Sequence, residues 1–444
     1  MKTLKKFQKA IATTLLIIFS SYFFTSCYTL ESTTQVGTER IPRTEEKTGV
    51  KKYTYETTQN PTMYNPEVNL KIQENEQYKV QTKTKYENKY EKNRGTKLLG
   101  SIFAVLGFSA GGISMCALVD DEFLPEIIFP SYGLASLGIY FMACPLISGS
   151  GPQNRDEELL GHKPFLVLAD HLTKNGIAVL RFDDRGIAES TGDFQIATSL
   201  DFARDVEFAI KYLQTRKEIN KNQIGLVGHS EGGIIAPMVA AEFEDINFIV
   251  LLAGTGIRGN QLLLLQQELI GKASGISDTE LQKAKVINKG AFDIVLKSNN
   301  TDSLKRELTD YIKQALKDNP GSEKPEGMSE DDYVKLQVNQ LTSPWMQFFI
   351  KYDPSIILEK VKCPVLAING AKDLQVSPKV NLDAIKKALE KGGNKNVTTK
   401  ELPNLNHLFQ ECETGLPSEY VTIEQTFSPI ALDEITKWIL KQVK

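Results

Sequence analysis

One stretch constrains the fold of this 444-residue chain more than any other. Residues 223–236 read Q-I-G-L-V-G-H-S-E-G-G-I-I-A, in which an apolar run predicts a short buried strand and the residues from Gly233 onward predict a helix. Between them, the pentapeptide G-H-S-E-G around Ser230 matches G-x-S-x-G. A strand, a tight turn around a serine and a helix form a nucleophile elbow, where small residues let strand and helix approach closely. The context therefore predicts Ser230 as a nucleophile, although the bare pentapeptide also occurs by chance.

A serine hydroxyl is a poor nucleophile at neutral pH and needs an adjacent base. The chain has only four histidines, His162, His171, His229 and His407. The first two flank a predicted helix before the elbow, and His229 lies inside the elbow, where its ring cannot turn back onto the neighbouring oxygen. His407 follows a predicted strand and a turn, so elimination leaves it as the base. An ordinary surface histidine is the alternative interpretation.

The imidazole needs a third group that fixes its tautomer and stabilises its charged form. Asp373 follows the strand predicted at 365–368, at the carboxyl end of a strand, where the sites of open α/β sheets gather. We therefore predict Asp373 as the partner of His407, with a helix cap as the alternative role for this residue.

Two segments are candidates for an oxyanion hole. The amide of Glu231 lies at the start of the helix behind Ser230, where free amides and the helix dipole favour negative charge. A second small-residue loop reads S-G-S-G-P-Q-N-R-D over residues 148–156 and follows another predicted strand. Small residues at a strand end let amides face a ligand, so Ser150 or Gly151 is the expected second donor. A plain turn is the alternative for this loop.

Apolar strands and amphipathic helices alternate on both sides of the elbow, with strands predicted at 176–182, 248–252, 365–368 and 397–402. This alternation predicts an α/β fold, with a mostly parallel sheet covered by helices on both faces. Residues 257–352 interrupt the rhythm with helical patterns and are too long for a connection, so we expect a helical cap over the site. Its apolar residues either line a pocket or pack the cap: Leu262, Leu263, Leu264, Leu265, Trp345, Met346, Phe348 and Phe349.

The first residues predict export. A lysine-rich start and an apolar run at 11–24 precede Thr25-Ser26-Cys27, which is typical of a secretory signal. A cysteine after small residues resembles a bacterial lipobox, so we expect residues 1–26 to be a lipoprotein signal and Cys27 to carry the lipid. An uncleaved signal anchor is the alternative. The chain is thus expected in the cell envelope as a membrane-anchored lipoprotein, with the domain that contains Ser230 outside the cytoplasm.

The segments that follow the signal predict a membrane-associated region. Residues 27–95 are polar and partly strand-forming, with alternation at 68–90. The stretches 98–119 and 127–147 carry no charge, and each has about the 20 residues that a bilayer crossing needs. We therefore assign 96–138 to apolar membrane-associated segments and 139–444 to the α/β domain that contains Ser230. A buried element is the alternative for either stretch.

Charge and cysteine usage exclude some partners. A net charge of −3 gives no electrostatic footprint for nucleic acid. Five scattered cysteines without a C-x-x-C pair give no metal signature. No organic cofactor is expected either, because a serine, a histidine, an aspartate and backbone amides supply nucleophile, base and oxyanion donors by themselves.

Several motifs carry a family resemblance: S-G-S-G-P-Q-N-R-D-E from Ser148, R-F-D-D-R-G from Arg181, G-H-S-E-G-G from Gly228 and L-N-H-L-F-Q from Leu405. They resemble serine hydrolases of the α/β-hydrolase superfamily, in particular bacterial secreted carboxylesterases and dienelactone-hydrolase-like or acyl-peptidase-like proteins. The resemblance runs from about residue 147 to the end of the chain. The order serine, aspartate, histidine is also the α/β-hydrolase order.

The resemblance implies Ser230 as nucleophile with Asp373 and His407 as its partners, and hydrolysis of a small-molecule ester through an acyl-enzyme. A serine peptidase or an acyltransferase on the same triad is the first alternative. The second is a non-catalytic envelope lipoprotein with a degenerate hydrolase domain. The latter draws on two departures: Ala188 stands where the family usually has glycine, and no antiparallel opening strands are recognised before residue 139, so that 68–90 is a candidate substitute edge.

Overall fold

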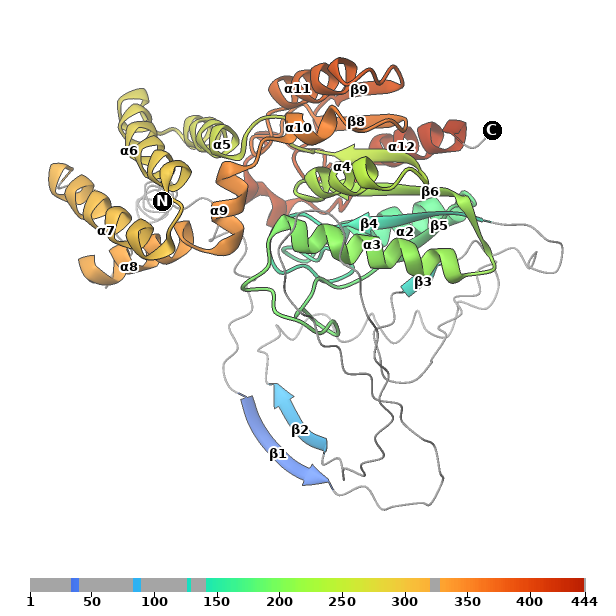
Figure 1. The fold of residues 1–444 in the computed structure, drawn as a ribbon, viewed down its shortest axis with the longest axis horizontal. Helices are drawn as coiled ribbons and strands as arrows, with labels where there is room; N and C mark the ends of the chain where they lie inside the picture. Colours follow the sequence, from blue (N-terminus) through green and yellow to red (C-terminus); the bar gives the residue numbers. More distant parts are fainter. Residues whose placement is uncertain (1–32, 40–82, 89–125, 129–140, 320–327, 443–444) are drawn as a thin grey trace. The chain divides into compact units, whose positions relative to one another are not determined.

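The computed structural model describes residues 33–39, 83–88, 126–128, 141–319 and 328–442. The chain divides into two units, one formed by Cys27–Leu106 and the other by the remaining residues. In the smaller unit, strands β1 (Thr33–Glu39) and β2 (Lys83–Asn88) pair antiparallel in a two-stranded sheet of their own (Figure 1). β2 lies within the stretch whose alternation predicts a strand, but it does not act as an edge of the larger sheet.

The larger unit is built on a seven-stranded sheet in the order β3-β5-β4-β6-β7-β8-β9. Its strands are β3 (Glu126–Ile128), β4 (Phe141–Ile147), β5 (Ala178–Arg181), β6 (Ile219–His229), β7 (Ile246–Leu252), β8 (Val365–Gly370) and β9 (Val397–Leu402). All neighbours are parallel except β3, which pairs antiparallel with β5. The prediction of a mostly parallel α/β sheet is confirmed.

Helices cover both faces of this sheet (Figure 1). The helices α3 (Ser199–Thr215), α4 (Gly232–Glu242), α10 (Pro354–Leu358) and α11 (Pro378–Lys391) pack on one face, and α2 (Pro164–Lys174) and α12 (Pro429–Gln442) pack on the other. Strand side chains alternate between the two cores: Ile249 and Leu251 of β7 face the first, and Val250 and Leu252 face the second. Burial on both faces explains why central strands such as β7 and β8 are almost continuously apolar.

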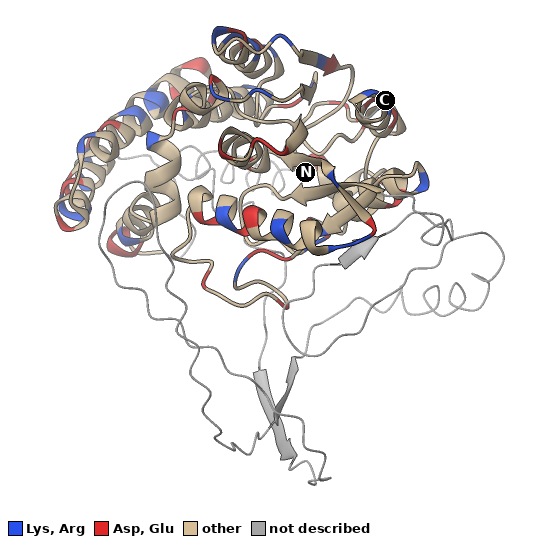
Figure 2. Cartoon of the chain, turned by 45° about the vertical axis from the view of Figure 1, so that its right-hand side comes forward, with Lys and Arg blue, Asp and Glu red and all other residues tan. Residues whose placement is uncertain are grey.

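Residues between β7 and β8 form the helical cap. Its helices are α5 (Gly259–Ala273), α6 (Asp278–Lys297), α7 (Thr301–Asp318), α8 (Glu330–Leu341) and α9 (Pro344–Lys351). Four of them begin after a residue whose side chain accepts a hydrogen bond from a first-turn amide, namely Ser277, Asn300, Ser329 and Ser343. Charged residues of both signs follow one another along the cap helices (Figure 2).

The prediction of a membrane segment at 127–147 is wrong at the two ends of the stretch that the structure describes. Residues 126–128 form the edge strand β3, and residues 141–147 form β4, which is buried between β5 and β6. A strand buried on both faces and a membrane helix are apolar for the same reason, so an uncharged run does not distinguish them. The sheet also includes β3, an antiparallel edge strand that lies before residue 139 in the sequence.

The other N-terminal predictions fall on residues 1–26, Cys27 and 98–119, which lie outside the described residues. Across the ranges that are described, no helix is both long enough and apolar enough to span a membrane.

Candidate active site

Ser230 lies at the turn between β6 and α4, with the positive φ of 51° that non-glycine residues rarely adopt. Its amide donates to the carbonyl oxygen of Leu252 on β7 at 2.8 Å, which holds the strained turn against the sheet. A Cβ on Gly228 would overlap the carbonyl oxygen of Gly232, and one on Gly232 would overlap that of Ile147. Both glycines of G-x-S-x-G are therefore required by close backbone approach, as expected for a nucleophile elbow.

His407 and Asp373 lie together at the carboxyl ends of β9 and β8. The Nδ1 atom of His407 is 2.8 Å from Oδ2 of Asp373, and both side chains are buried. The other carboxylate oxygen, Oδ1, accepts hydrogen bonds from the amides of Gln375 and Val376, each at 2.8 Å. Each oxygen of Asp373 thus has its own partners, so the carboxylate can orient the imidazole in one way only.

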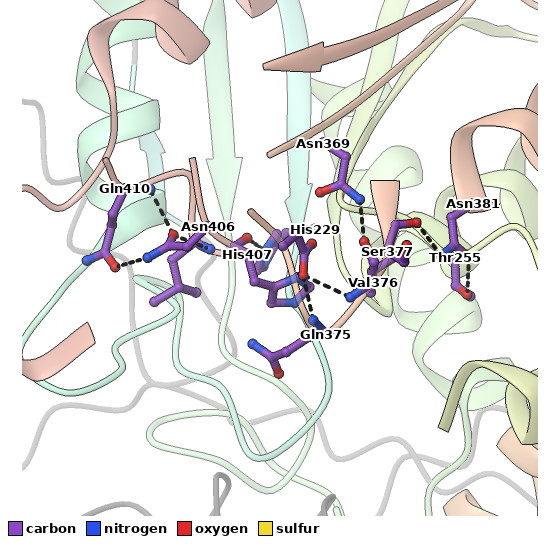
Figure 3. Close-up of polar contacts among 12 residues, drawn as sticks. His229, Thr255, Asn369, Gln375, Val376, Ser377, Asn381, Asn406, His407 and Gln410 are labelled. Carbon is purple, nitrogen blue, oxygen red and sulfur yellow. Dashed lines mark hydrogen bonds and ion pairs between the residues drawn. The ribbon is translucent and has the colours of Figure 1, made fainter. Parts of the chain in front are cut away.

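The turn that carries His407 is fixed by a neighbouring asparagine. The Oδ1 atom of Asn406 accepts from the amides of Leu408 and Gln410 at 3.0 and 2.9 Å, and its amide group donates to Oε1 of Gln410 at 2.9 Å. Figure 3 shows this Asn406–Gln410 contact beside His407. Sequence reasoning did not identify Asn406, although its place next to the base in L-N-H was the available signal.

Ser230 and His407 line the same pocket, so the structure brings together the serine, the histidine and, through the histidine, Asp373. The cap contributes Leu262, Leu263, Trp345 and Phe349 to this pocket, and the last two rings stack at 5.0 Å. Of the other apolar cap residues considered from the sequence, Met346 is buried in the core and Phe348 stacks on Tyr352.

The two oxyanion candidates in the loop after β4 differ in position. Ser150 lines the pocket together with Glu231, whereas Gly151 has a φ of 100° and is not among the pocket residues. In the described part of the chain, the amides of Ser150, Gly151 and Glu231 donate no hydrogen bond to another protein group. The preceding amide, that of Gly149, is engaged by Oε1 of Glu157 at 2.6 Å. Ser150 is therefore the better placed of the two donors that the sequence left open.

The side chain of Glu231 links the elbow to the cap. Its Oε1 atom accepts from the Ser199 hydroxyl at 2.6 Å and from the Trp345 indole nitrogen at 2.7 Å. Burial raises the pKa of Glu231 to about 7, although both hydrogen bonds act in the opposite direction. This carboxyl therefore holds its proton to a higher pH than an exposed glutamate does.

A second buried carboxyl contacts the loop that follows β4, residues 148–156. Asp184 accepts from the Ser148 hydroxyl at 2.8 Å and from the amide of Gln153 at 3.0 Å. Burial raises the pKa of Asp184 well above its ordinary value, while these two hydrogen bonds oppose the change. The carboxyl thereby joins the loop after β4 to the loop after β5.

His229, which the sequence argument excludes as the base, makes two buried contacts within the site. Its Nδ1 atom is 2.9 Å from Oε1 of Glu157, and its Nε2 atom is 3.0 Å from the carbonyl oxygen of His407. Glu157 had no sequence signal, because the contact spans 72 positions. Among the residues that the structure describes, no three His, Cys, Asp or Glu side chains gather as a metal site requires.

Comparison with known proteins gives one family and several distant relatives. Residues 163–413 match the family described as "Serine aminopeptidase, S33". Esterase EstD of Thermotoga maritima is 26% identical over 309 residues, which cover 68% of this chain and 62% of that protein. An uncharacterized protein from the traX-finO intergenic region of Escherichia coli is 25% identical over 237 residues, which cover 53% of this chain and 73% of that protein.

Among solved structures, Est1E of Butyrivibrio proteoclasticus with bound ferulic acid is 16% identical, covers 72% of this chain and 95% of its own, and has a TM-score of 0.40. The chain spans about three fifths of the length of Esterase EstD.

Proposed function

The chain belongs to the serine aminopeptidase (S33) family of α/β hydrolases, and from this premise we propose that it cleaves carboxylic esters through an acyl-enzyme on Ser230. The observation that carries the proposal is the 2.8 Å contact of His407 with Asp373 beside a serine held in a strained elbow. These are the base, the orienting acid and the nucleophile that acyl transfer requires.

The proposed reaction has two halves. In the first, Nε2 of His407 takes the proton of Ser230 Oγ while Oγ bonds to the ester carbonyl carbon. The carbonyl electron pair moves onto its oxygen, which the amides of Glu231 and Ser150 stabilise. Collapse breaks the bond to the alcohol oxygen, and the alcohol leaves with the proton from His407. Water then attacks the acyl-enzyme in the same way, which releases the acid and restores the serine.

The lining of the pocket supports a neutral substrate with an apolar acyl group. Among the described residues that line it there is no lysine or arginine, and the two carboxyl groups of this lining already have partners: Glu157 contacts His229 and Gly149, and Glu231 contacts Ser199 and Trp345. The stacked Trp345 and Phe349 offer an apolar wall. An esterase among the relatives, Esterase EstD, agrees with this substrate class.

The family description favours a peptidase as the second candidate. An aminopeptidase binds the α-ammonium of its substrate, which requires an accessible anion once the cation leaves water. Because both carboxyls of the pocket are engaged by other groups, the ester remains the better fit. An acyltransferase would use the same acyl-enzyme with an alcohol or amine in place of water.

The test compares Ser230→Ala with Ser274→Ala, which alters an exposed serine outside the pocket. We expect wild type and Ser274→Ala to hydrolyse p-nitrophenyl acetate and to be labelled by a fluorophosphonate probe. Ser230→Ala should do neither while keeping its thermal transition. Product analysis with peptides, and with an added alcohol acceptor, separates the three reactions. Unchanged hydrolysis in Ser230→Ala would refute the proposal.

The N-terminal sequence supports a separate proposal about location. The apolar run at 11–24 followed by Thr25-Ser26-Cys27 is consistent with a lipid on Cys27 that anchors the enzyme in the cell envelope. Cys27→Ala should lose labelling by a fatty-acid probe and move the protein out of the membrane fraction. Wild type without the lipid label would contradict this proposal.

A further inference from the structure

The ring of His229 is buried between two oxygen atoms from different loops, and Figure 3 shows this residue beside His407. Its Nε2 atom lies 3.0 Å from the carbonyl oxygen of His407, and its Nδ1 atom lies 2.9 Å from Oε1 of Glu157. The rings of His229 and His407 are 4.9 Å apart. The histidine inside the elbow therefore contacts the backbone of the residue proposed as the base.

Both oxygens act as acceptors. A backbone carbonyl only accepts, so Nε2 of His229 must carry a proton. Oε1 of Glu157 also accepts from the amide of Gly149 at 2.6 Å; when Glu157 carries its negative charge this oxygen only accepts, and Nδ1 of His229 then donates as well. The contacts therefore match a buried imidazolium paired with a carboxylate. Burial alone lowers the pKa of His229, but the charge of Glu157 and its hydrogen bond raise the pKa above its ordinary value overall.

The contacts form one continuous path across the site. It runs from the amide of Gly149 to Glu157, then to His229, and from there to the carbonyl of His407. A Cβ on Gly149 would lie 3.2 Å from both Oε1 of Glu157 and Cβ of Ser230, so the path packs directly against the elbow. Glu157 itself has a φ of 51°, a conformation that persists only where the surroundings hold it.

We propose that His229 and Glu157 are positioning residues that hold the oxyanion loop and the base loop in register with Ser230. Through Glu157 the pair fixes Gly149, which precedes the Ser150 amide, and through His229 it fixes the backbone of His407. Neither side chain takes part in bond making. The kinetic part of this inference rests on the proposed ester hydrolysis.

Glu157→Ala removes the acceptor for both Gly149 and His229. We expect its kcat on p-nitrophenyl acetate to fall about 100-fold, the cost of displacing reacting groups by about 1 Å, with KM changed by less than about threefold. Glu157→Gln keeps an oxygen for the amide of Gly149 but loses the charge that pairs with His229, so it should retain more kcat than Glu157→Ala. The matched control is Glu158→Gln in the same loop, where the carboxylate pairs with Lys163 at 3.3 Å, and it should behave as wild type.

A nitrogen-15 spectrum of the histidine rings gives a readout that needs no substrate. The chain has four histidines, and the spectrum of His229→Gln identifies the signals of His229. We expect both ring nitrogens of His229 to stay protonated to a higher pH in wild type than in Glu157→Gln, because Glu157 raises the pKa of His229. If Glu157→Ala does not fold, this spectrum and the kinetics of Glu157→Gln decide.

The outcomes separate the two proposals. A His229 ring that loses its proton at the same pH in wild type and in Glu157→Gln overturns the pair. The pair is also overturned if wild type is active and folded Glu157→Ala keeps kcat within about threefold, since displacement predicts about 100-fold. A wild type that neither hydrolyses esters nor reacts with the fluorophosphonate probe refutes the ester hydrolase instead. In that case the ring spectrum alone tests the pair.

Discussion

Replacing Asp373 by asparagine tests the triad most sharply, because the two carboxylate oxygens have different partners. Oδ1 accepts from the amides of Gln375 and Val376, and Oδ2 faces Nδ1 of His407. Asparagine has one oxygen and one NH2 group. If the NH2 group replaced Oδ1, it would face two amide donors and leave both unsatisfied at about 1–3 kcal/mol each. The oxygen therefore stays at Oδ1, and the NH2 group faces His407.

This orientation reverses the tautomer of the base. Nδ1 of His407 must then accept a hydrogen bond, so the ring proton moves to Nε2, which can no longer take the proton of Ser230. A triad with the wrong tautomer loses about 10⁴ in kcat, which corresponds to about 5.5 kcal/mol at 1.36 kcal/mol per factor of ten. We expect this loss in Asp373→Asn, together with slow fluorophosphonate labelling and an unchanged thermal transition.

Asp373→Ala is the matched comparison. It removes both acceptors and leaves the buried amides of Gln375 and Val376 without partners, so its unfolding free energy should fall by about 1–3 kcal/mol for each amide. The assay measures kcat on p-nitrophenyl acetate and chemical denaturation for both variants. Two results would refute the reasoning. The first is that Asp373→Asn retains more than about a tenth of the wild-type kcat, since the wrong tautomer predicts a loss of about 10⁴. The second is that Asp373→Asn is as unstable as Asp373→Ala.

Three further predictions concern stability. Burial raises the pKa of Glu231 from its ordinary 4.5 to about 7 in the folded state, so the unfolding free energy should fall by up to about 3 kcal/mol as pH rises from 4.5 to 7. Urea titrations of Glu231→Gln should not show that fall. A pH dependence equal to that of wild type would contradict the prediction. Gly232→Ala should destabilise by more than about 4 kcal/mol or fail to fold, because its Cβ meets the Ile147 carbonyl; a normal thermal transition would argue against this. Ala188 has a φ of 47°, so Ala188→Gly should stabilise by up to about 1 kcal/mol, and a lowered melting temperature would count against strain there.

The candidates for the elbow, the base and its acid could be chosen from the sequence because each is signalled locally. Ser230 stands between a strand and a helix, Asp373 follows a strand that an apolar run reveals, and His407 follows the strand predicted at 397–402. Parallel strands end at the same edge of a sheet, so local signals suffice to bring these residues together. The sequence could not choose between Ser150 and Gly151, because the choice depends on how the loop after β4 turns.

The contacts that fix the site were not predictable, since they join distant positions. Glu157 and His229 are 72 residues apart, and neither lies in a pattern that marks it as buried. The sequence places His229 next to Ser230, whereas its hydrogen-bond partners come from two other loops. The prediction of a membrane segment at 127–147 was wrong at its described ends for another reason. An apolar run indicates burial, but it does not distinguish burial in lipid from burial in a protein core.

The two parts of Glu231 connect substrate binding with oxyanion stabilisation. Its backbone amide is a proposed oxyanion donor, a role that any non-proline residue could fill. Its carboxyl is nonetheless buried, which costs free energy that the hydrogen bonds from Ser199 and Trp345 offset. Trp345 is also a wall of the pocket, on cap helix α9. The Glu231 side chain therefore connects the cap to the elbow through its hydrogen bond with Trp345. A substrate that displaces Trp345 would break this hydrogen bond at the residue whose amide is the proposed oxyanion donor.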